Sequence, residues 1–308
     1  MKKKTWIIAT RESPLALWQA NWVKARLEQL HPHLSVKLLG ITTKADQLLA
    51  VPLYKVGGKG LFVKELEEAL YDGRADLAVH SMKDVPMLMP EGLCISAMCE
   101  REDPRDAFIS AQYTSLDDLP DDACVGTSSL RRQSQLLAKH PNLQVAFLRG
   151  NVNTRLAKLD KGDYAGIILA AAGLKRLGLQ SRIRSFISTD EMLPAPGQGV
   201  LGIECRIGDE ETRALLAPLD NEKSRQCVQA ERAMCRYLES GCHSPVAAYA
   251  QIDNDRLTLR GLVADPAGKK MLHALLAGNP DDAEVLGESV AQELLQQGAR
   301  LLLDKSHE

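Results

Sequence analysis

No apolar run in this sequence of 308 residues approaches the roughly 20 residues that a membrane-spanning helix needs, so we expect no membrane partner. The run that follows the basic first residues is interrupted at Arg11 and Glu12, which leaves it shorter than the core of about 7–15 residues in a secretory signal. The 7 cysteines are an odd number without the spacing of a disulfide framework, which is typical of a reducing compartment. Together these absences predict a cytoplasmic protein.

Several common binding sites are missing as well. The sequence has no Cys or His pairs at the spacing of a zinc site, so we expect no metal, and the phosphate-binding pattern G-x-x-x-x-G-K-[ST] is absent. Aromatic residues make up 4% of the chain, and only Phe147 and Tyr164 occur between residues 127 and 184, where basic residues gather. Nucleic-acid binding is therefore a weak alternative, because platforms for base stacking are missing.

The residues that are present fit an ordinary globular protein. Hydrophobic residues make up 45% and charged residues 25%, and the formal net charge is −2. The length suits two or three domains of roughly 100–200 residues each, with room for a sizeable core.

Positive charge is concentrated between residues 127 and 184. Only Asp160 and Asp163 are acidic there. The basic residues are Arg131, Arg132, Lys139, Arg149, Arg155, Lys158, Lys161, Lys175, Arg176, Arg182 and Arg184. Because the whole chain is nearly neutral, this is a local positive field.

Two turns in this stretch, at residues 126–129 and 150–154, are each expected to open a helix with small or polar residues. Ser and Thr cap helices, and the free N–H groups at a helix start attract anions. The arginines beside these turns are Arg131, Arg132, Arg149 and Arg155. A guanidinium group offers a planar pair of donors to a carboxylate or phosphate. We favour an anion-binding cleft over a solvated basic face, the usual alternative for a run of charges.

A similar turn occurs near the start of the chain. Residues 6–9 predict a buried strand, after which Ser13 is a suitable helix cap and Pro14 suits the first helical position. Arg11 lies in this turn, where open α/β sheets bind ligands, although a surface arginine is the commoner explanation of one such residue.

Polar residues also follow the strand expected at residues 77–79. Lys83 and Asp84 come just past its end, and Pro86 stops any helix from continuing. A carboxylate beside a lysine is a candidate acid–base or charge-stabilising pair, and a surface ion pair worth roughly 0–1 kcal/mol is the alternative. We expect His80 to be a hydrogen-bonded structural histidine.

Glycines at residues 57, 58 and 60, with Lys59 among them, predict a mobile loop. The loop could close over a bound anion, or it could be a plain connection. Phe62 begins the helix that is predicted to follow it.

Two segments, at residues 100–106 and 194–199, have the charge or the proline content of a crossing between domains. The alternation of strands and helices around them predicts an α/β fold with two lobes. The first lobe is expected at 1–99 plus 200–217, and the second, with the basic cleft, at 105–193. Two crossings suit a hinge that opens and closes a cleft.

The remaining residues, 222–308, predict a small α+β domain. The pattern gives a helix at 222–238, three strands, and a last helix that begins near residue 279. Cys242 lies in a turn after the first helix, not on its apolar face. An exposed thiol in a turn can be a nucleophile or an attachment point, and an unremarkable cysteine is the alternative.

Eight short motifs, taken in order, resemble the porphobilinogen deaminase family. They are RESPLALWQA at 11–20, VGGKGLFVKE at 56–65, VHSMKDVP at 79–86, EREDPRDA at 100–107, GTSSLRRQ at 126–133, RGNVNTRL at 149–156, GLKRLG at 173–178 and GQGVLGIE at 197–204. With Cys242, the resemblance extends over residues 7–242, and the rest of the chain fits by length and style. The joint occurrence of so many motifs in one order is highly specific.

The resemblance implies a transferase of porphyrin and heme biosynthesis. Such an enzyme joins four porphobilinogen molecules head to tail into the linear tetrapyrrole hydroxymethylbilane and releases ammonia at each step. It also implies a dipyrromethane cofactor linked by a thioether to Cys242. The implied fold has two α/β lobes like those of periplasmic binding proteins, with hinge crossings, and a small C-terminal α+β domain that carries Cys242. By family precedent the protein is a monomer.

The resemblance further implies roles for individual residues. Asp84 is the implied catalytic carboxylate, which stabilises cationic intermediates. The residues implied to hold the cofactor are Cys242, Ser81, Lys83, Thr127, Ser128, Ser129, Arg131, Arg132 and Arg155. The residues implied to bind the substrate are Arg11, Ser13, Gln19, Arg149 and Arg176. The residues implied to belong to the mobile loop are Lys59 and Phe62.

The sequence departs from the family's usual pattern at two places. Residues 43–46 read Thr-Lys-Ala-Asp where Arg-Gly-Asp is usual, and Ser240 stands where the family more often has a second glycine before the cysteine. Neither departure removes a chemical group that the mechanism needs. A non-enzymatic anion-binding protein of the same two-lobed fold is the main rival, since it would explain the basic residues but not Asp84 or Cys242.

Overall fold

The computed structural model describes residues 5–43, 63–241 and 244–305. The contacts divide the chain into two compact units, and each is described by itself. Unit 1 comprises Met1–Arg101 and Val200–Arg225, and unit 2 comprises Glu102–Gly199 and Gln226–Glu308. The chain leaves unit 1 within the first predicted crossing and returns to it at the end of the second. The predicted site residues Lys59, Phe62 and Cys242 lie outside the described residues.

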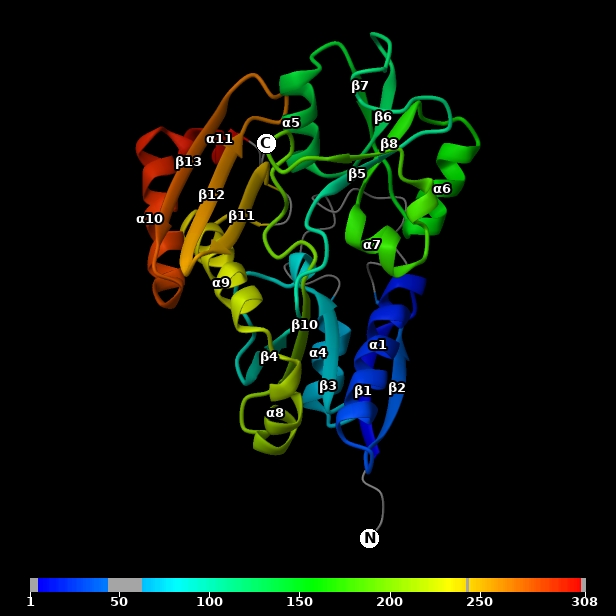
Figure 1. The fold of residues 1–308 in the computed structure, drawn as a ribbon, viewed down its shortest axis with the longest axis vertical. Helices are drawn as coiled ribbons and strands as arrows, with labels where there is room; N and C mark the ends of the chain where they lie inside the picture. The colour runs from blue at the N-terminus through cyan, green and yellow to red at the C-terminus, as the bar shows by residue number, and fades with distance from the viewer. Residues whose placement is uncertain (1–4, 44–62, 242–243, 306–308) are drawn as a thin grey trace. The chain divides into compact units, whose positions relative to one another are not determined.

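In the described part of unit 1, five strands form a mixed sheet in the order β2-β1-β3-β10-β4. Strand β1 pairs in parallel with β2 and β3, whereas β10, which follows the second crossing, runs antiparallel between β3 and β4 (Figure 1). The strands are β1 (Thr5–Arg11), β2 (Ser35–Ile41), β3 (Leu77–Ser81), β4 (Leu93–Met98) and β10 (Leu201–Arg206). Parallel strands β1 and β3 end at the same edge of the sheet.

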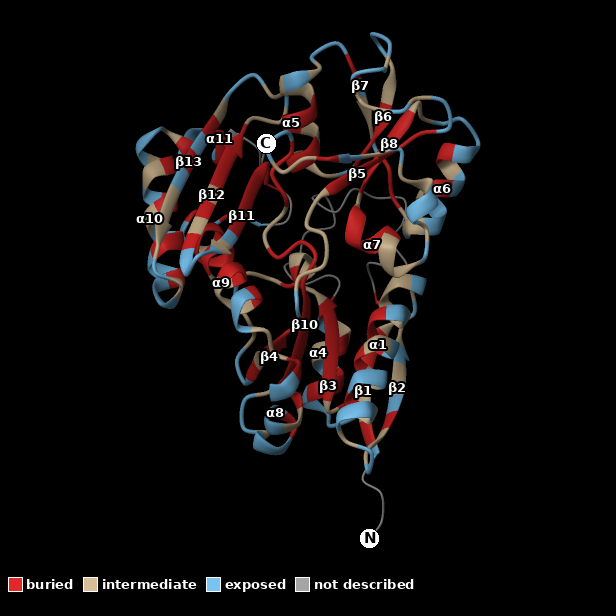
Figure 2. Ribbon diagram, in the orientation of Figure 1, coloured by how far each residue is buried: buried red, intermediate tan, exposed pale blue. Residues whose placement is uncertain are grey.

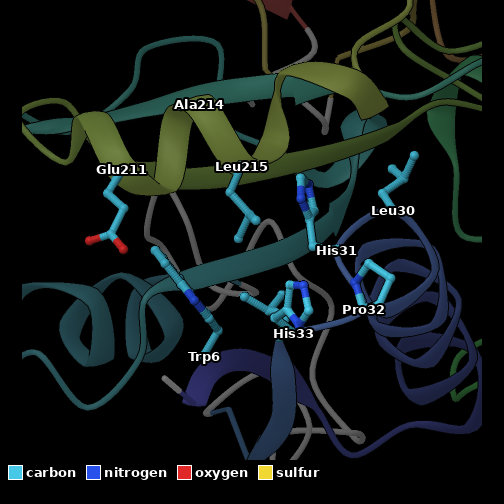
Figure 3. A pocket seen from close by; sticks show the side chains of 9 residues that line it. Trp6, Leu30, His31, Pro32, His33, Glu211, Ala214 and Leu215 are labelled. Atoms are coloured by element: carbon cyan, nitrogen blue, oxygen red, sulfur yellow. The ribbon is translucent and has the colours of Figure 1, made fainter. Parts of the chain in front are cut away.

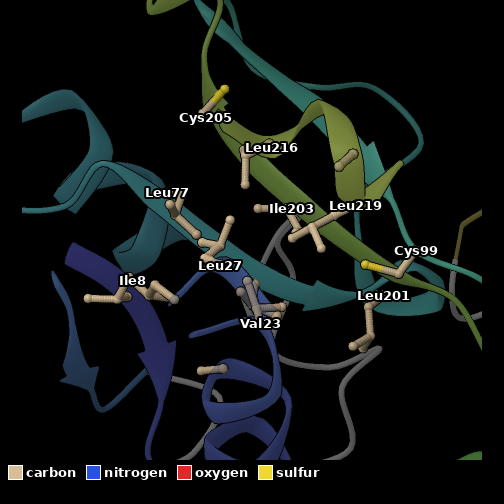
Figure 4. Close-up of a cluster of buried hydrophobic side chains, with 14 of the residues drawn as sticks. Ile8, Val23, Leu27, Leu77, Cys99, Leu201, Ile203, Cys205, Leu216 and Leu219 are labelled. Atoms are coloured by element: carbon tan, nitrogen blue, oxygen red, sulfur yellow. The ribbon is translucent and has the colours of Figure 1, made fainter. Parts of the chain in front are cut away.

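Helices cover both faces of this sheet. Helix α1 (Pro14–Leu30) begins where the sequence predicts, because the Ser13 side chain accepts a hydrogen bond from the Ala16 N–H. Val23 and Leu27 of α1 pack with strand residues and with Leu216 of α8 (Glu210–Leu216) in one buried cluster (Figure 4). On the other face, α4 (Lys64–Tyr71) packs Leu66 and Leu70 against Ala78 of β3.

Unit 2 contains a second mixed sheet, in the order β7-β6-β8-β5-β9. Strand β6 is parallel to β7 and β8, and β5, which follows the first crossing, runs antiparallel between β8 and β9. The strands are β5 (Asp106–Ile109), β6 (Cys124–Gly126), β7 (Gln144–Ala146), β8 (Gly166–Ala170) and β9 (Ser185–Ile187). Strand positions and directions match those of the unit 1 sheet, which confirms the prediction of two similar α/β lobes.

The helices of this second lobe follow its strands as expected, and a C-terminal sheet completes unit 2. The lobe's α-helices are α5 (Leu130–Lys139), α6 (Val152–Asp160) and α7 (Ala171–Arg176). The C-terminal elements are β11 (Val246–Asp253), β12 (Arg256–Ala264), β13 (Met271–Gly278), α9 (Glu222–Tyr237), α10 (Ala283–Gln296) and α11 (Ala299–Lys305). Buried residues concentrate on the strands and on the helix faces toward them (Figure 2).

The α+β character of the C-terminal part is confirmed, since β11, β12 and β13 form an antiparallel sheet and α10 packs on it. The lobe and this sheet also contact each other within unit 2, where Gln133 Nε2 donates to Pro266 O at 3.1 Å. The residue limits predicted for the three domains stay a prediction.

Three details of the C-terminal elements and lobe 2 differ from the prediction. Strand β9 and helix α11 were not expected. The first C-terminal helix ends at Tyr237, one residue before its predicted end at 238, and the backbone leaves the helical conformation at Glu239, with φ +55°. A non-glycine residue in this conformation is uncommon, so the sequence pattern carries no signal for an end at this residue.

Candidate functional site

A pocket in unit 1 lies at the carboxyl ends of β1 and β3. The predicted site residues in its lining are Arg11, Ser13, Gln19, Ser81 and Asp84. Gln19 comes from α1, and its Nε2 donates a hydrogen bond to Ser81 Oγ at 2.9 Å. The structure thus brings together predicted residues from a strand end, a helix start and the turn after a second strand.

Asp84 ends a short 3-10 turn (Met82–Asp84) that follows β3 directly. The Met82 N–H donates to Val200 O at 2.9 Å, and the Val85 N–H closes the turn on Met82 O at 3.2 Å. Lys83 lies in the middle of the turn and is half-buried. Among the described residues, no hydrogen bond or ion pair engages the half-buried Asp84 carboxylate, which leaves it available to a ligand.

Three of the hydroxyl groups predicted to hold the cofactor, those of Thr127, Ser128 and Ser129, lie at a helix start in unit 2. The Ser129 side chain caps α5 by accepting from the Arg132 N–H, and Thr127 Oγ1 accepts from the Ser129 N–H at 3.2 Å. Ser128 Oγ donates to Leu148 O at 2.5 Å and so ties this turn to the chain just before the second basic turn. The two turns are therefore joined to each other within unit 2.

Arg131 and Arg132 are buried, with exposed fractions of 4% and 6%, and both bind the fully buried carboxylate of Asp106. Arg132 donates from Nη2 and Nε to Asp106 Oδ1 at 2.7 and 3.1 Å, and Arg131 Nη2 lies 2.8 Å from Oδ2. Their Nη1 atoms donate to the carbonyl groups of Leu193 and Ile168. Several N–H groups of both guanidinium groups therefore bind acceptors within the lobe itself. The binding of these arginines to a cofactor stays a prediction.

This cluster remains complementary to an anion. Burial by itself would raise the pKa of Asp106, but the charges and hydrogen bonds of Arg131 and Arg132 outweigh it and hold that pKa well below its ordinary value. Gln198 Nε2 donates to Asp106 Oδ1 at 3.1 Å and fixes the carboxylate further. Two guanidinium groups against one carboxylate leave a net positive charge at the start of α5.

The second basic turn places Arg149 and Arg155. Asn151 caps α6 by accepting from the Thr154 N–H, and Arg155 Nε donates to Gly150 O at 2.8 Å. Glycine is required at 150, because φ is +114° and a Cβ would lie 2.7 Å from Thr154. Arg149 is 8% exposed, and burial lowers its pKa. A carboxylate ligand would offset that cost by favouring the charged form.

Arg176 lies at the end of α7 and contacts the second crossing. Its Nη2 donates to Gly199 O at 2.7 Å, and its neighbour Lys175 forms an ion pair with Glu102 of the first crossing at 2.5 Å. One short helix therefore binds both segments that lead out of unit 2. The role of Arg176 in binding substrate stays a prediction.

Sequence reasoning missed Glu204 and Asp106 as members of these sites. His80 lines the unit 1 pocket, and its Nε2 lies 2.8 Å from Glu204 Oε2 of β10. The predicted hydrogen-bonded histidine is thus confirmed, but its partner was not foreseen. An acidic residue within the otherwise apolar strand VLGIEC, at 200–205, was the available signal. Asp106 stood among other acidic residues and gave no such signal.

A larger cavity of about 530 Å³ in unit 1 contains none of the predicted site residues. Trp6, His31, His33 and Glu211 are among its lining (Figure 3). Trp6 lies near the beginning of β1, whereas Arg11 of the Asp84 pocket ends this strand. The two cavities are therefore at opposite ends of the same strand.

The described residues contain neither a metal-binding cluster nor a membrane-spanning helix. Across 5–43, 63–241 and 244–305, no three His, Cys, Asp or Glu side chains gather so that they could hold a metal ion. No helix in these ranges has the length and apolar character needed to span a membrane.

The chain has two α/β lobes. One lobe carries an unengaged carboxylate and the other carries arginine-rich turns. These features suit an enzyme that acts on a small polyanion. Two family models specify it further. Residues 6–214 match the porphobilinogen deaminase dipyrromethane cofactor binding domain, and residues 225–296 match the porphobilinogen deaminase C-terminal domain. The chain therefore belongs to the porphobilinogen deaminase family. It is a transferase that polymerises porphobilinogen with the help of a dipyrromethane cofactor, which decides against the non-enzymatic alternative.

Solved structures similar to this chain include several binding proteins. The methionine binding protein MetQ is 15% identical with a TM-score of 0.46, over 74% of this chain and 91% of its own. The aliphatic sulphonate binding protein SsuA from Escherichia coli is 12% identical (TM-score 0.42; 76% and 70%). A nutrient binding protein from Burkholderia cenocepacia bound to methionine is 14% identical (TM-score 0.42; 69% and 90%). The family assignment rests on the family models and not on these structures.

The residues present fit a dipyrromethane. Each of its pyrrole rings carries an acetate and a propionate side chain, and the ring nitrogens are hydrogen-bond donors. The net positive cluster around Asp106 and the buried Arg149 are complementary to carboxylates. The unengaged Asp84 carboxylate can accept hydrogen bonds from pyrrole N–H groups.

Proposed function

We propose that Asp84 is the catalytic carboxylate of this transferase and that Cys242 carries the dipyrromethane. The observation that supports Asp84 most directly is its place in a pocket with no hydrogen bond or ion pair to its carboxylate among the described residues. Cys242 is supported by the motif match alone, since it lies outside those residues. The dipyrromethane supplies the free pyrrole α-carbon from which the chain is extended.

The chemistry explains why a fixed carboxylate is needed. When the C–N bond of the aminomethyl group breaks and ammonia leaves, positive charge develops on the pyrrole. The neighbouring pyrrole would supply the α-carbon for the new C–C bond, and the proton released from that carbon would balance the ammonium ion formed. Asp84 stabilises the developing cation electrostatically and can accept the proton.

We further propose that the basic residues bind the acetate and propionate groups of cofactor and substrate. For the cofactor, the proposed set is Lys83, Arg131, Arg132 and Arg155, with Ser81, Thr127, Ser128 and Ser129. For the substrate, the proposed set is Arg11, Ser13, Gln19, Arg149 and Arg176. The burial of several guanidinium groups supports this, because charge–charge contacts strengthen where water is excluded.

Replacement of Asp84 tests the proposal. Asp84→Ala is expected to keep the cofactor attached and to lose about a thousandfold in kcat, because cation stabilisation and proton transfer are both lost. Porphobilinogen consumption gives kcat, and the intact mass of the denatured protein shows the cofactor. The matched control is Asp72→Ala, an exposed aspartate of the same unit, which is expected to turn over normally. Normal turnover of the Asp84→Ala holoenzyme would remove the assignment.

We also propose that the enzyme works in the cytoplasm as a monomer and binds neither nucleic acid nor membranes. The cysteine usage supports a reducing compartment, and the scarcity of aromatic residues among the basic ones argues against base stacking. Light scattering of the protein as it elutes from a size-exclusion column is expected to give a mass near 33.8 kDa. A multiple of that mass would contradict the monomeric state.

A further inference from the structure

The pair formed by His80 and Glu204 is buried beneath the Asp84 pocket. The side chains are 4% and 1% exposed, and His80 Nε2 lies 2.8 Å from Glu204 Oε2. In the register of β3 and β10, Glu204 stands opposite Ala78, which packs against α4. His80 is two residues beyond Ala78 and shares its face of the sheet. The pair therefore lies between the sheet and α4, one residue before Ser81.

Stability alone does not account for this pair. Removing a carboxylate and an imidazole from water is costly, and apolar residues of similar volume commonly do as well or better. Glu204 Oε1 is buried and has no hydrogen-bond partner within the described residues, so the carboxylate is only partly compensated. A buried polar pair kept at such a cost, with His80 in the lining of the pocket, indicates a role in the site.

The pair is placed to control the turn that carries Asp84. His80 is opposite Gly202 in the pairing of β3 with β10. The next backbone hydrogen bond that follows joins the Met82 N–H to Val200 O. The side-chain bond from His80 to Glu204 crosses the same two strands diagonally. It therefore resists sliding or twisting of the end of β3 against β10, and this strand end continues into Met82–Asp84.

Helix α4 and strand β10 also carry other charged groups. Helix α4 contributes Glu67, whose pKa is raised to about 7 by burial and by Glu204, with His80 acting in the opposite sense and Glu68 adding to the rise. Arg206, further along β10, donates to Asp209 at 2.9 Å. The direct hydrogen-bond partner of His80 in this group is Glu204, so the ring orientation depends on that carboxylate.

We propose that His80, held by Glu204, is a positioning residue that fixes the turn bearing Asp84. This rests on the proposed role of Asp84. The imidazole ring lines the pocket, and its hydrogen bond with Glu204 restrains its rotation. Loss of the acceptor frees both the ring and the end of β3, so the carboxylate departs from its productive place while the arginines that bind substrate are unchanged.

A graded series at position 204 tests this. Glu204→Leu holoenzyme is expected to lose roughly ten- to hundredfold in kcat with KM within about threefold of wild type, because misplacement affects the reacting group and not the binding groups. Glu204→Gln is expected to recover most of the activity, because its amide oxygen still accepts from the imidazole. Holoenzyme is counted by intact mass, so that loss of folded protein is not read as loss of kcat.

The matched control is Asp220→Asn, which removes another carboxylate of unit 1 that binds Arg225 at 2.6 Å and the Met98 N–H at 2.7 Å. It is expected to unfold at lower urea with normal kcat. If Glu204→Leu does not fold, His80→Gln, which keeps a donor for Glu204, is measured and is expected to lower kcat in the same way. Wild-type kcat in either folded variant overturns the inference.

Asp84→Ala, measured alongside, separates the two proposals. If Asp84→Ala is inactive and Glu204→Leu turns over normally, the positioning role alone is wrong. If Asp84→Ala is active, the proposed function fails and the positioning role fails with it.

Discussion

The Glu67 carboxyl on α4 behaves unlike an ordinary surface glutamate. Burial, and next the negative charge of Glu204, raise its pKa from 4.5 to about 7, while His80 lowers it. Between these two pH values the folded protein binds more protons than the unfolded chain. The contribution of Glu67 to stability is therefore fully present below pH 4.5 and is lost as the pH rises through 7.

Glu67→Gln is expected to remove this pH dependence. The variant should gain stability relative to wild type at pH 8 and change little or lose some at pH 5, because glutamine resembles the protonated acid. Urea unfolding at the two pH values measures the difference. Glu288→Gln, exposed on α10 and not among the groups that act on Glu67, is the control, with an effect expected to be equal at both pH values. An equal effect of Glu67→Gln at both pH values would contradict the account.

Single arginines show where sequence reasoning stops. The charge pattern singled out Arg131 and Arg132, since residues 126–133 combine a helix cap with two guanidinium groups. It could not show that both are buried on Asp106, because that carboxylate comes from a separate strand, β5. Similarly, His80 was expected to have a partner, but Glu204 is 124 residues away in the chain. Long-range pairing of this kind depends on the sheet topology.

At the scale of elements, the contact of β10 with the turn after β3 is unusually close. A Cβ on Gly202 would lie 2.2 Å from Met82 Sδ and 3.2 Å from its Cγ, and Met82 is fully buried. A glycine in a strand interior commonly marks such a close approach. Met82 begins the turn that ends at Asp84, so this contact helps to set the position of the carboxylate.

Gly202→Ala is expected to cost about 1–3 kcal/mol in the free energy of unfolding, because the added methyl group overpacks a filled site. It should also lower kcat, since Met82 has to move. Urea denaturation and steady-state kinetics measure the two effects. Gly208→Ala, where a Cβ would meet no atom within 4 Å, is the matched control. Unchanged stability and kcat in Gly202→Ala would contradict this prediction, because the Met82 side chain would then have adjusted without moving the turn.

Most elements could be predicted from local sequence signals. The elements that were missed have no such signals. Ser13 and Pro14 predicted the start of α1 because capping is a local interaction. Strand β9 is three residues long and includes Phe186, which is 40% exposed, so it shows no continuous apolar run. Its pairing with β5 gives it its structure.

At the scale of the molecule, the two lobes repeat one topology. Each sheet receives one antiparallel strand after a crossing, β10 in unit 1 and β5 in unit 2. In unit 2, Lys175 and Arg176 bind the two crossing segments. Buried Glu231 accepts from the Gly197 N–H at 2.7 Å and from the Ala250 N–H at 2.8 Å, so the second crossing is also tied to the C-terminal sheet. The sequence predicted the crossings but not the residues that hold them.

The central claim is that the dipyrromethane is attached to this chain at Cys242. The intact mass of the denatured protein, measured beside Cys242→Ser, tests it most directly. We expect an adduct of two linked pyrrole units on the wild type and on Cys124→Ser, a control that removes a free, half-buried thiol. We expect no adduct on Cys242→Ser. An adduct that persists on Cys242→Ser would contradict the attachment site. A wild-type mass that stays bare after incubation with porphobilinogen would contradict the account of the cofactor.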